Sequence, residues 1–380
     1  MIRPFALERY FARHEFSARF LLGSSDPESL SVAELLALEP GSEEGLCRLR
    51  LGYTESPGDR GLRREIAGLY ETISPEDVLV FSGAEEPIFV FMNAALERGD
   101  HLIVHFPSYQ SHHAVAESLG LRVSRWRGDP AAGWAPDPFA LERLIESDTR
   151  ALLTCGPHNP TGYLFDPGAW NEILAVARRH GLIIFSDEVY RGTEHDPADR
   201  LPAACDLYEK GVSLGGLSKS YGLAGLRLGW IATRDRALLG RMAQFKDYLS
   251  LCNSAPSEYL GRIAVSQTQA LFERTRRRLI LHRELLAAFF GRQERRFRWT
   301  KPRAGTTIFP EFLGGSALAF CDRLVEDTGI MLVPGALFDV TDGEYIRFGY
   351  GRADCPEALA GLEAYLDSAR GIFKETKVKP

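Results

Sequence analysis

The sequence predicts an α/β protein: a large domain with a mostly parallel sheet, followed by a smaller α+β domain. Three observations support this prediction. The chain has 380 residues, which is enough for a large domain and a smaller companion. From residue 77 to 232, short apolar runs alternate with helical patterns, as in parallel sheets that helices cover on both faces. After a long helical stretch, strands and helices are mixed, which is typical of an α+β domain.

An N-terminal segment, residues 1–47, is expected to pack with the smaller domain. It shows two amphipathic helical patterns. The first covers Leu7–Phe20. The second follows Asp26 and Pro27, which suit the N-cap and the first position of a helix. A turn-rich loop that starts at Leu51 then leads into a helix, Leu62–Glu71.

The large domain is expected over residues 48–290 and the smaller one over 291–380. Strands of the large domain are predicted at Val78–Phe81, Leu102–His105, Ala151–Thr154, Leu182–Phe185, Val212–Leu214 and Leu228–Ala232. Its helices are predicted at Pro87–Leu96, Tyr109–Leu119, Pro167–His180 and, as one long stretch, Ser257–Phe290. The smaller domain should hold strands Thr307–Phe309 and Tyr345–Phe348, helices Leu318–Asp327 and Pro356–Ala369, and a polar tail, Lys374–Pro380.

Composition narrows the class of protein. The net charge of −6 argues against nucleic-acid binding, which calls for a basic face. The six cysteines are scattered, and no His/Cys cluster has metal-ligand spacing, so we expect reduced thiols, a cytoplasmic location and no metal. The N-terminus lacks the apolar core of a signal peptide, and no stretch approaches the roughly 20 apolar residues of a membrane helix.

The stretch from Ser218 to Ile231 holds one lysine, Lys219, and an arginine, Arg227, eight residues later. A lysine among small residues at a turn can form a Schiff base with a flat aldehyde cofactor. The arginine can then bind the phosphate of that cofactor with two N–H groups. The alternative is an ordinary surface lysine in a glycine-rich loop.

Two further stretches follow predicted strands. Asp187 ends one strand, where a buried carboxylate needs a charged partner such as a protonated pyridine nitrogen. Tyr190 is close enough in sequence to donate its phenol to the ring oxygen of the same cofactor. The alternative for Asp187 is a cap or turn residue. The segment His158–Gly162 contains Asn159, whose amide can bind that same oxygen, although Asn–Pro and Thr–Gly alone predict only a loop.

A glycine turn, Ser82–Glu85, lies between a predicted strand and helix. Its backbone N–H groups and the helix N-terminus suit a phosphate. Because ligands of parallel sheets bind at the carboxyl ends of the strands, we expect these stretches to meet there.

Together these stretches carry a resemblance to the fold-type I pyridoxal-phosphate enzymes of the class I/II aminotransferase family. The matching pieces occur in the family's order and span nearly the whole chain. They are Tyr53 with the Gly58 loop, Gly83–Ala84, Tyr109, His158–Gly162, Asp187, Tyr190, Ser218–Lys219, Arg227 and Arg347.

The resemblance implies a role for each position. Lys219 would form the Schiff base with pyridoxal 5'-phosphate and then move the substrate proton through a quinonoid intermediate. Asp187 would pair with the pyridine nitrogen, and Arg347 would bind the substrate carboxylate. The other implied cofactor contacts are Gly83, Ala84, Glu85, Tyr109, Asn159, Tyr190, Ser218 and Arg227. The resemblance also implies a homodimer in which Tyr53 reaches the phosphate of the partner's site.

Two departures from the family pattern stand out. Gly216 occupies a position where many relatives carry a phosphate-binding Ser or Thr. Binding of the phosphate would therefore depend more on Arg227 and the Gly83 turn. The stretch Leu22–Ser29 differs from the commoner Gly–x–Pro. In this it resembles a branch of the family that contains capreomycidine synthase and the arginine oxidases.

The resemblance implies an aminotransferase that converts amino acids and keto acids. The alternative on the same cofactor is elimination with cyclisation, or O₂-dependent oxidation, of an arginine-like amino acid. In the family the segment that contains Gly23 and Asp26 lies over the substrate side chain. Since Asp26 and Glu28 are acidic, a cationic substrate is a hypothesis. The competing explanation is that Asp26 caps a helix and Glu28 suits its positive end.

Overall fold

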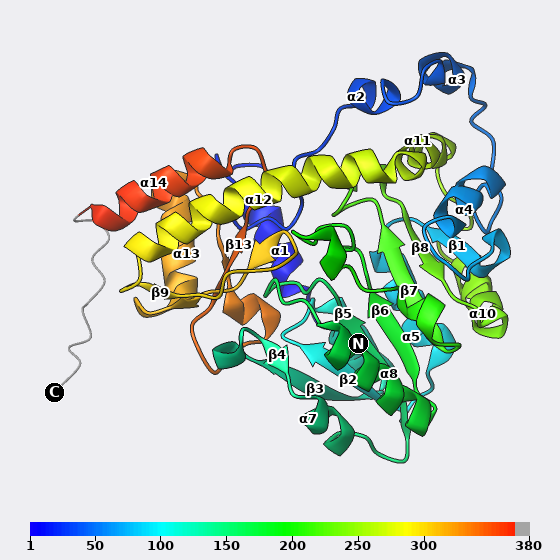
Figure 1. The fold of residues 1–380 in the computed structure, drawn as a ribbon, viewed down its shortest axis with the longest axis horizontal. Helices are drawn as coiled ribbons and strands as arrows, with labels where there is room; N and C mark the ends of the chain where they lie inside the picture. The colour runs from blue at the N-terminus through cyan, green and yellow to red at the C-terminus, as the bar shows by residue number, and fades with distance from the viewer. Residues whose placement is uncertain (369–380) are drawn as a thin grey trace.

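The computed structural model describes residues 1–368 and is built around one large sheet (Figure 1). Among the described residues this sheet has eight strands in the order β1-β8-β7-β6-β5-β2-β3-β4. The strands are β1 Val78–Phe81, β2 His101–Phe106, β3 Arg122–Asp129, β4 Ala135–Pro136, β5 Thr149–Cys155, β6 Ile183–Asp187, β7 Gly211–Gly216 and β8 Gly229–Ala232. The predicted tail, Lys374–Pro380, and the predicted helix end at Ala369 lie outside the described residues.

The sheet is mostly parallel, which confirms the predicted class. Strands β3, β2, β5, β6 and β7 are parallel neighbours. In contrast, β8 runs antiparallel to both β7 and β1, and β4 runs antiparallel to β3. Residues 217–228, which include a 3₁₀ turn at Ala224–Leu226, connect β7 to β8.

Helices cover both faces of the sheet, and alternate strand residues divide between them. In β2, Leu102 and Val104 pack in a cluster with Ile88 of α5, whereas Ile103 packs with Ile173 of α8. The helices of this layer are α4 Arg60–Ala67, α5 Glu85–Ala95, α6 Ser111–Leu119, α7 Pro138–Arg143, α8 Pro167–His180, α9 Ala204–Leu207, α10 Arg236–Lys246 and α11 Ala255–Ser266. The sequence reasoning missed β3, β4, α7, α9 and α10.

The C-terminal part forms two small sheets and a separate apolar core. The strand orders are β10-β13-β12 and β11-β9. These strands are β9 Phe297–Arg298, β10 Thr307–Ile308, β11 Glu311–Phe312, β12 Val333–Pro334 and β13 Ile346–Gly349. The helices are α12 Thr268–Arg292, α13 Ala317–Thr328 and α14 Cys355–Asp367. Helix α12 runs along the molecule from α11 to these small sheets (Figure 1).

The N-terminal segment differs from the prediction. Helix α1 covers Ala6–His14 and ends before Phe20, which pairs with Ile330 instead. No helix begins at Pro27. The next helices are α2, which covers Val32–Leu36, and α3, which covers Ser42–Arg48. The prediction that Asp26 is an N-cap is therefore wrong.

Local hydrogen bonds explain this difference. Ser31 and Glu34 form a complete capping box that starts α2. The Asp26 carboxylate instead accepts hydrogen bonds from Ser24 and from Arg352. Residues 20–23 lie against the small sheets, where Gly23 N donates to Met331 O over 2.7 Å. The predicted boundary between the N-terminal segment and the large domain, at residue 47, stays a prediction. The same holds for the boundary between the large and the smaller domain, at residue 290.

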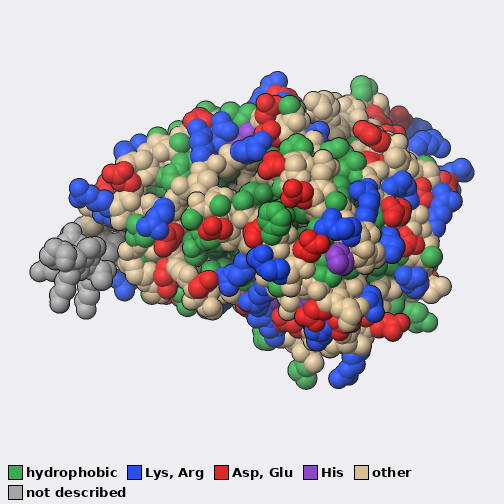
Figure 2. All heavy atoms as spheres, turned by 60° about the horizontal axis from the view of Figure 1, so that its bottom comes forward, with side chains coloured by type: hydrophobic (Ala, Val, Ile, Leu, Met, Phe, Trp, Pro, Cys, Tyr) green, Lys and Arg blue, Asp and Glu red, His purple; other side chains and the backbone are tan. Residues whose placement is uncertain are grey.

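The surface carries mixed charge. Figure 2 shows Lys and Arg side chains interspersed with Asp and Glu over the face that it draws. No helix among residues 1–368 is long and apolar enough to span a membrane. All six cysteines are free, and four of them are buried.

Candidate active site

A cavity of about 550 Å³ lies at the carboxyl ends of the central parallel strands. This is the edge where such sheets bind ligands. Most of the residues that the sequence singled out line it: Asp26, Ala84, Glu85, Tyr109, Asn159, Asp187, Tyr190, Ser218, Lys219, Arg227 and Arg347. The segment Phe5–Glu15, around α1, contributes Phe5, Leu7, Glu8, Phe11 and Glu15 to the opposite wall.

Lys219 lies in the loop that follows β7 and reaches into this cavity. Two backbone hydrogen bonds close the loop, from Leu217 N to Leu228 O and from Leu223 N to Leu217 O. The ammonium group donates to Ser25 Oγ over 2.8 Å. Burial lowers the pKa of Lys219, and the Asp26 carboxylate partly offsets this. A lysine with a lowered pKa has more neutral amine, which is the nucleophilic form.

Asp187 ends β6 with its carboxylate buried at the cavity. Its Oδ2 accepts from His112 Nε2 over 3.0 Å, and its Oδ1 accepts from Val189 N over 3.2 Å. The second ring nitrogen of His112, Nδ1, is buried without a hydrogen-bond partner in the described part of the chain. His112 was missed by the sequence reasoning, although it lies one helical turn after Tyr109, a spacing that places both on one face.

Tyr190 and Asn159 lie on the same side of the cavity as Arg347. Tyr190 is buried, which raises the pKa of its phenol, and a hydrogen bond with Ser25 partly offsets the rise. Asn159 Oδ1 accepts from Arg347 Nη1 over 3.1 Å. Ser25 therefore contacts both Lys219 and Tyr190, and the sequence reasoning did not single it out.

Arg347 comes from β13 and is only 1% exposed. Its Nε donates to Gly23 O over 3.0 Å, and its guanidinium carbon lies 5.1 Å from the centre of the Phe338 ring. With the Asn159 contact, these partners hold the guanidinium in one orientation. A fixed, buried guanidinium that lines a cavity suits bidentate binding of a carboxylate.

The turn before α5 forms a close cradle with Arg227. Gly83 has a φ of +89°, and a Cβ on it would lie 2.5 Å from Arg227 Nη2. A Cβ on Gly229 would lie 2.7 Å from the Gly83 carbonyl carbon, so this packing needs both glycines. Among the ion pairs of residues 1–368, none involves Arg227. An unpaired guanidinium beside a helix N-terminus fits a phosphate.

Gly216 lies next to this cradle at the position where the family often has a hydroxyl. A Cβ there would lie 3.4 Å from Leu228 O and 3.7 Å from the Ala84 Cβ, so a small side chain would fit. The chain therefore has a cradle without that hydroxyl. The residues of this cradle, together with Lys219 and Asp187, fit pyridoxal phosphate.

Acidic side chains gather on the wall formed by α1. Glu8 Oε1 accepts from the Tyr109 hydroxyl over 2.9 Å. Burial and the nearby Asp26 and Glu8 carboxylates raise the pKa of Glu15. Glu28 lies outside the cavity, and its Oε2 accepts from Ala353 N over 2.8 Å. The sequence reasoning missed Glu8 and Glu15, whose spacing of seven residues around Phe11 marks one helical face.

Tyr53 is not brought to this cavity within one chain. Its side chain is 90% exposed and lies beside residues 250–256 in an open groove. Leu51, which lines the same groove, is also exposed. Tyr248, Leu249 and Leu251, next to Ser250 in the chain, are exposed as well.

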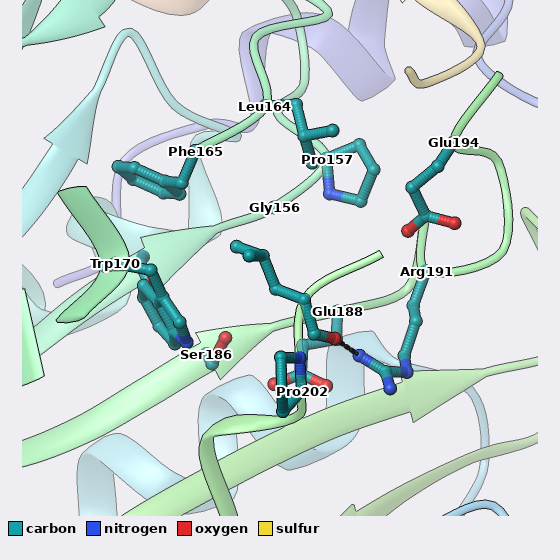
Figure 3. Close-up of a pocket in the computed structure, with 12 residues that line it drawn as sticks. Gly156, Pro157, Leu164, Phe165, Trp170, Ser186, Glu188, Arg191, Glu194 and Pro202 are labelled. Carbon is teal, nitrogen blue, oxygen red and sulfur yellow. Dashed lines mark hydrogen bonds between the residues drawn. The ribbon is translucent and has the colours of Figure 1, made fainter. Parts of the chain in front are cut away.

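A second, much smaller cavity of about 30 Å³ lies on the other face of β5 and β6 (Figure 3). Thr154, Ser186 and Glu188 line it, whereas their neighbours Cys155 and Asp187 line the large cavity. It has room for about one or two water molecules. It is too small for an amino acid, so the large cavity is the candidate active site.

Comparison with known proteins identifies the family. Residues 20–361 match the family model for aminotransferase class I and II. Capreomycidine synthase of Streptomyces vinaceus is 29% identical and covers 97% of this chain and 96% of its own. Arginine–pyruvate transaminase of Pseudomonas aeruginosa is 29% identical over 90% of this chain and 88% of its own.

A solved structure gives the same result. The pyridoxal-phosphate-dependent aminotransferase from Streptococcus suis superimposes with a TM-score of 0.90 at 27% identity, covering 96% of this chain and 98% of its own. The family match spans most of the chain. The protein therefore belongs to the class I and II aminotransferase family and is a pyridoxal-phosphate-dependent aminotransferase that acts on an α-amino acid.

Proposed function

We propose that Lys219 binds pyridoxal phosphate covalently, while Asp187 pairs with the ring nitrogen and Arg347 binds the α-carboxylate of the substrate. The observation that carries this proposal is that all three side chains line one cavity. The bound cofactor supplies an electron sink for the electrons released when the Cα–H bond breaks. Once free, the Lys219 amine would take the proton from Cα of the substrate and hold it beside the bound cofactor.

The other side chains hold the cofactor and orient the reacting amine. Arg227, Ser218 and the backbone of Gly83, Ala84 and Glu85 would bind the phosphate. Asn159 and Tyr190 would bind the ring oxygen, and Tyr109 would lie on the ring face. His112 holds the Asp187 carboxylate, so it acts as a positioning residue.

We infer that the side chain of the substrate is cationic. Glu8, Glu15 and Asp26 line the cavity, and no ion pair of Glu8 or Glu15 is found among the described residues. Asp26 already contacts Arg352 and Ser24. Glu8 and Glu15 are therefore the stronger evidence for a cationic side chain. Carboxylates without ion pairs in a partly open pocket favour a cation, and a guanidinium matches them best. The arginine named in the Pseudomonas relative agrees with this inference.

We also infer a homodimer with shared sites in the cytoplasm. Tyr53 and Leu51 are exposed in one open groove, and exposed apolar side chains of this kind are typical of an interface. From the partner subunit, Tyr53 would reach the phosphate cradle. Free cysteines, most of them buried, are usual in a reducing compartment.

A second candidate function is elimination with cyclisation, or oxidation by O₂, of an arginine-like amino acid. The similarity to capreomycidine synthase over 97% of the chain favours considering it. Both reactions begin with loss of the Cα proton, so they need the same residues.

A screen of amino donors decides between them. The purified protein is incubated with L-arginine, L-lysine and L-glutamate, with pyruvate as acceptor, and keto acid, ammonia and peroxide are all measured. Transamination predicts a new keto acid and alanine without ammonia or peroxide. Release of ammonia or peroxide that is independent of pyruvate would favour the second candidate.

A further inference from the structure

Glu85 is the first residue of α5 and directly follows Gly83 and Ala84 in the phosphate cradle. It lines the same cavity as Ser218 and Arg227. Its Oε2 accepts from Ser111 Oγ over 3.3 Å. No cation lies within ion-pair distance of Glu85 among residues 1–368. An acidic residue without an ion-pair partner in the described part of the chain thus directly follows the turn that would hold the phosphate, with its carboxyl group beside Ser111.

The groups that face Glu85 come from several elements. Glu8 in α1 and Asp187 in β6 add negative charge, whereas His112 in α6 favours the carboxylate form. Arg227 approaches the cradle from the loop before β8. Burial outweighs the other effects and raises the pKa of Glu85 to about 7. The side chain is therefore divided between its neutral and charged forms near neutral pH.

We propose that Glu85 takes up a proton when the cofactor binds, and that it serves the phosphate site as a neutral carboxylic acid. This inference rests on the proposed position of the phosphate at the Gly83 turn. A phosphate monoester carries a charge of roughly −1.5 to −2 at neutral pH. A carboxylate close to it is repelled, whereas a carboxylic acid can donate a hydrogen bond to an anion.

The sign of the pH dependence follows from this linkage. Binding raises the pKa of Glu85 above its value of about 7 in the free protein. The contribution of Glu85 to affinity is then fully present below about pH 7 and is lost as the pH rises toward the pKa in the complex. Each unit of that rise in pKa corresponds to about tenfold in affinity. Glutamine resembles the neutral acid, so E85Q removes this dependence.

Proton uptake is the direct test. Apoprotein is mixed with pyridoxal phosphate at about pH 8 in weak buffer, and the protons taken up are counted for the wild type and for E85Q. For a rise of one unit in the pKa of Glu85, the wild type should take up roughly 0.4 more protons per subunit than E85Q at this pH. The dissociation constant, from equilibrium dialysis between about pH 6.5 and pH 9, should rise about tenfold more for the wild type than for E85Q.

E86Q is the matched control, because it removes a charge from the next residue. Glu86 accepts from Ser82 N over 2.7 Å and from Ser250 N over 3.3 Å, and glutamine can keep the shorter of these bonds. Infrared difference spectra of the wild type give a second measurement, in which a carboxylic-acid band should appear on binding. Equal proton uptake by the wild type and E85Q, or no such band, would overturn the proposal. Unchanged affinity of Arg227→Gln would instead contradict the position of the phosphate, which separates the two failures.

Discussion

His112 Nε2 lies 3.0 Å from Asp187 Oδ2 and joins helix α6 to the end of β6. Because a carboxylate only accepts hydrogen bonds, the imidazole donates, and this fixes which ring nitrogen carries the proton. The same helix and the residues before it reach other walls of the cavity, since Tyr109 donates to Glu8. The segment from Tyr109 to His112 thus orients the Asp187 carboxylate and contacts α1.

The first prediction concerns this contact. His112→Phe removes a hydrogen bond to a charged group, which is worth roughly 1.5–3 kcal/mol, so kcat/KM should fall about 10- to 100-fold. His112→Asn keeps an N–H donor and should recover part of the loss. The absorbance spectrum of the bound cofactor should shift in His112→Phe and return toward the wild-type spectrum in His112→Asn. Equal kinetics and spectra for both variants would show that the contact only supports the fold.

The second prediction concerns Arg347. Arg347→Lys keeps the charge but loses the planar pair of donors, so KM for every amino donor should rise about tenfold or more. The exposed Arg298 is the control, since Arg298→Lys should leave KM unchanged. Steady-state kinetics with a neutral and a cationic donor check both. A loss confined to one donor would contradict a role in binding the α-carboxylate.

The third prediction concerns the acidic wall. Glu15→Gln should lower kcat/KM for L-arginine several-fold to tenfold and change that for L-alanine little, because only the cation needs the charge. Burial raises the pKa of Glu15, and the carboxylate is the form that binds a cation. The preference for arginine should therefore increase as the pH rises through that raised pKa, and Glu15→Gln should flatten it. An equal loss for both donors would contradict this role.

The fourth prediction concerns the proposed dimer. Subunits with Tyr53→Ala and subunits with Lys219→Ala should each be weakly active or inactive alone. Mixed dimers should regain activity, because one of their two sites has an intact Lys219 and receives Tyr53 from the other subunit. Native mass spectrometry confirms that subunits exchange. Exchange without recovery would mean that each site is built from one chain.

Much of the fold and the candidate site was predictable, because the signals were local. Strands β1, β5, β6 and β7 can be recognised from apolar runs and turn glycines that are adjacent in the sequence. The same is true of Lys219, Asp187 and Arg227, which occupy the ends of such runs. Asp187 and Lys219 meet because the carboxyl ends of parallel strands lie together, and Arg227 reaches the same edge just before the antiparallel β8 begins.

The rest depends on contacts between distant parts of the chain. Asp26 looked like a helix cap, but Arg352, more than 300 residues away, binds its carboxylate. Glu8 and Glu15 gain a role only because α1 packs against the cavity, and His112 only because α6 points it toward Asp187. The antiparallel direction of β8 is set by its pairing with β7 and β1, which apolar patterning does not encode.

The identity of the lysine that holds the cofactor tests the account most directly. The holoprotein is reduced with borohydride, which makes the link between lysine and cofactor permanent, and the labelled peptide is identified by mass spectrometry. Lys246 is a stringent comparison: it is also buried with a lowered pKa, but its ammonium donates to the carbonyls of Ser56 and Leu251. We predict the label on Lys219 and on no other lysine. A label on Lys246, or on any lysine besides Lys219, would contradict the account.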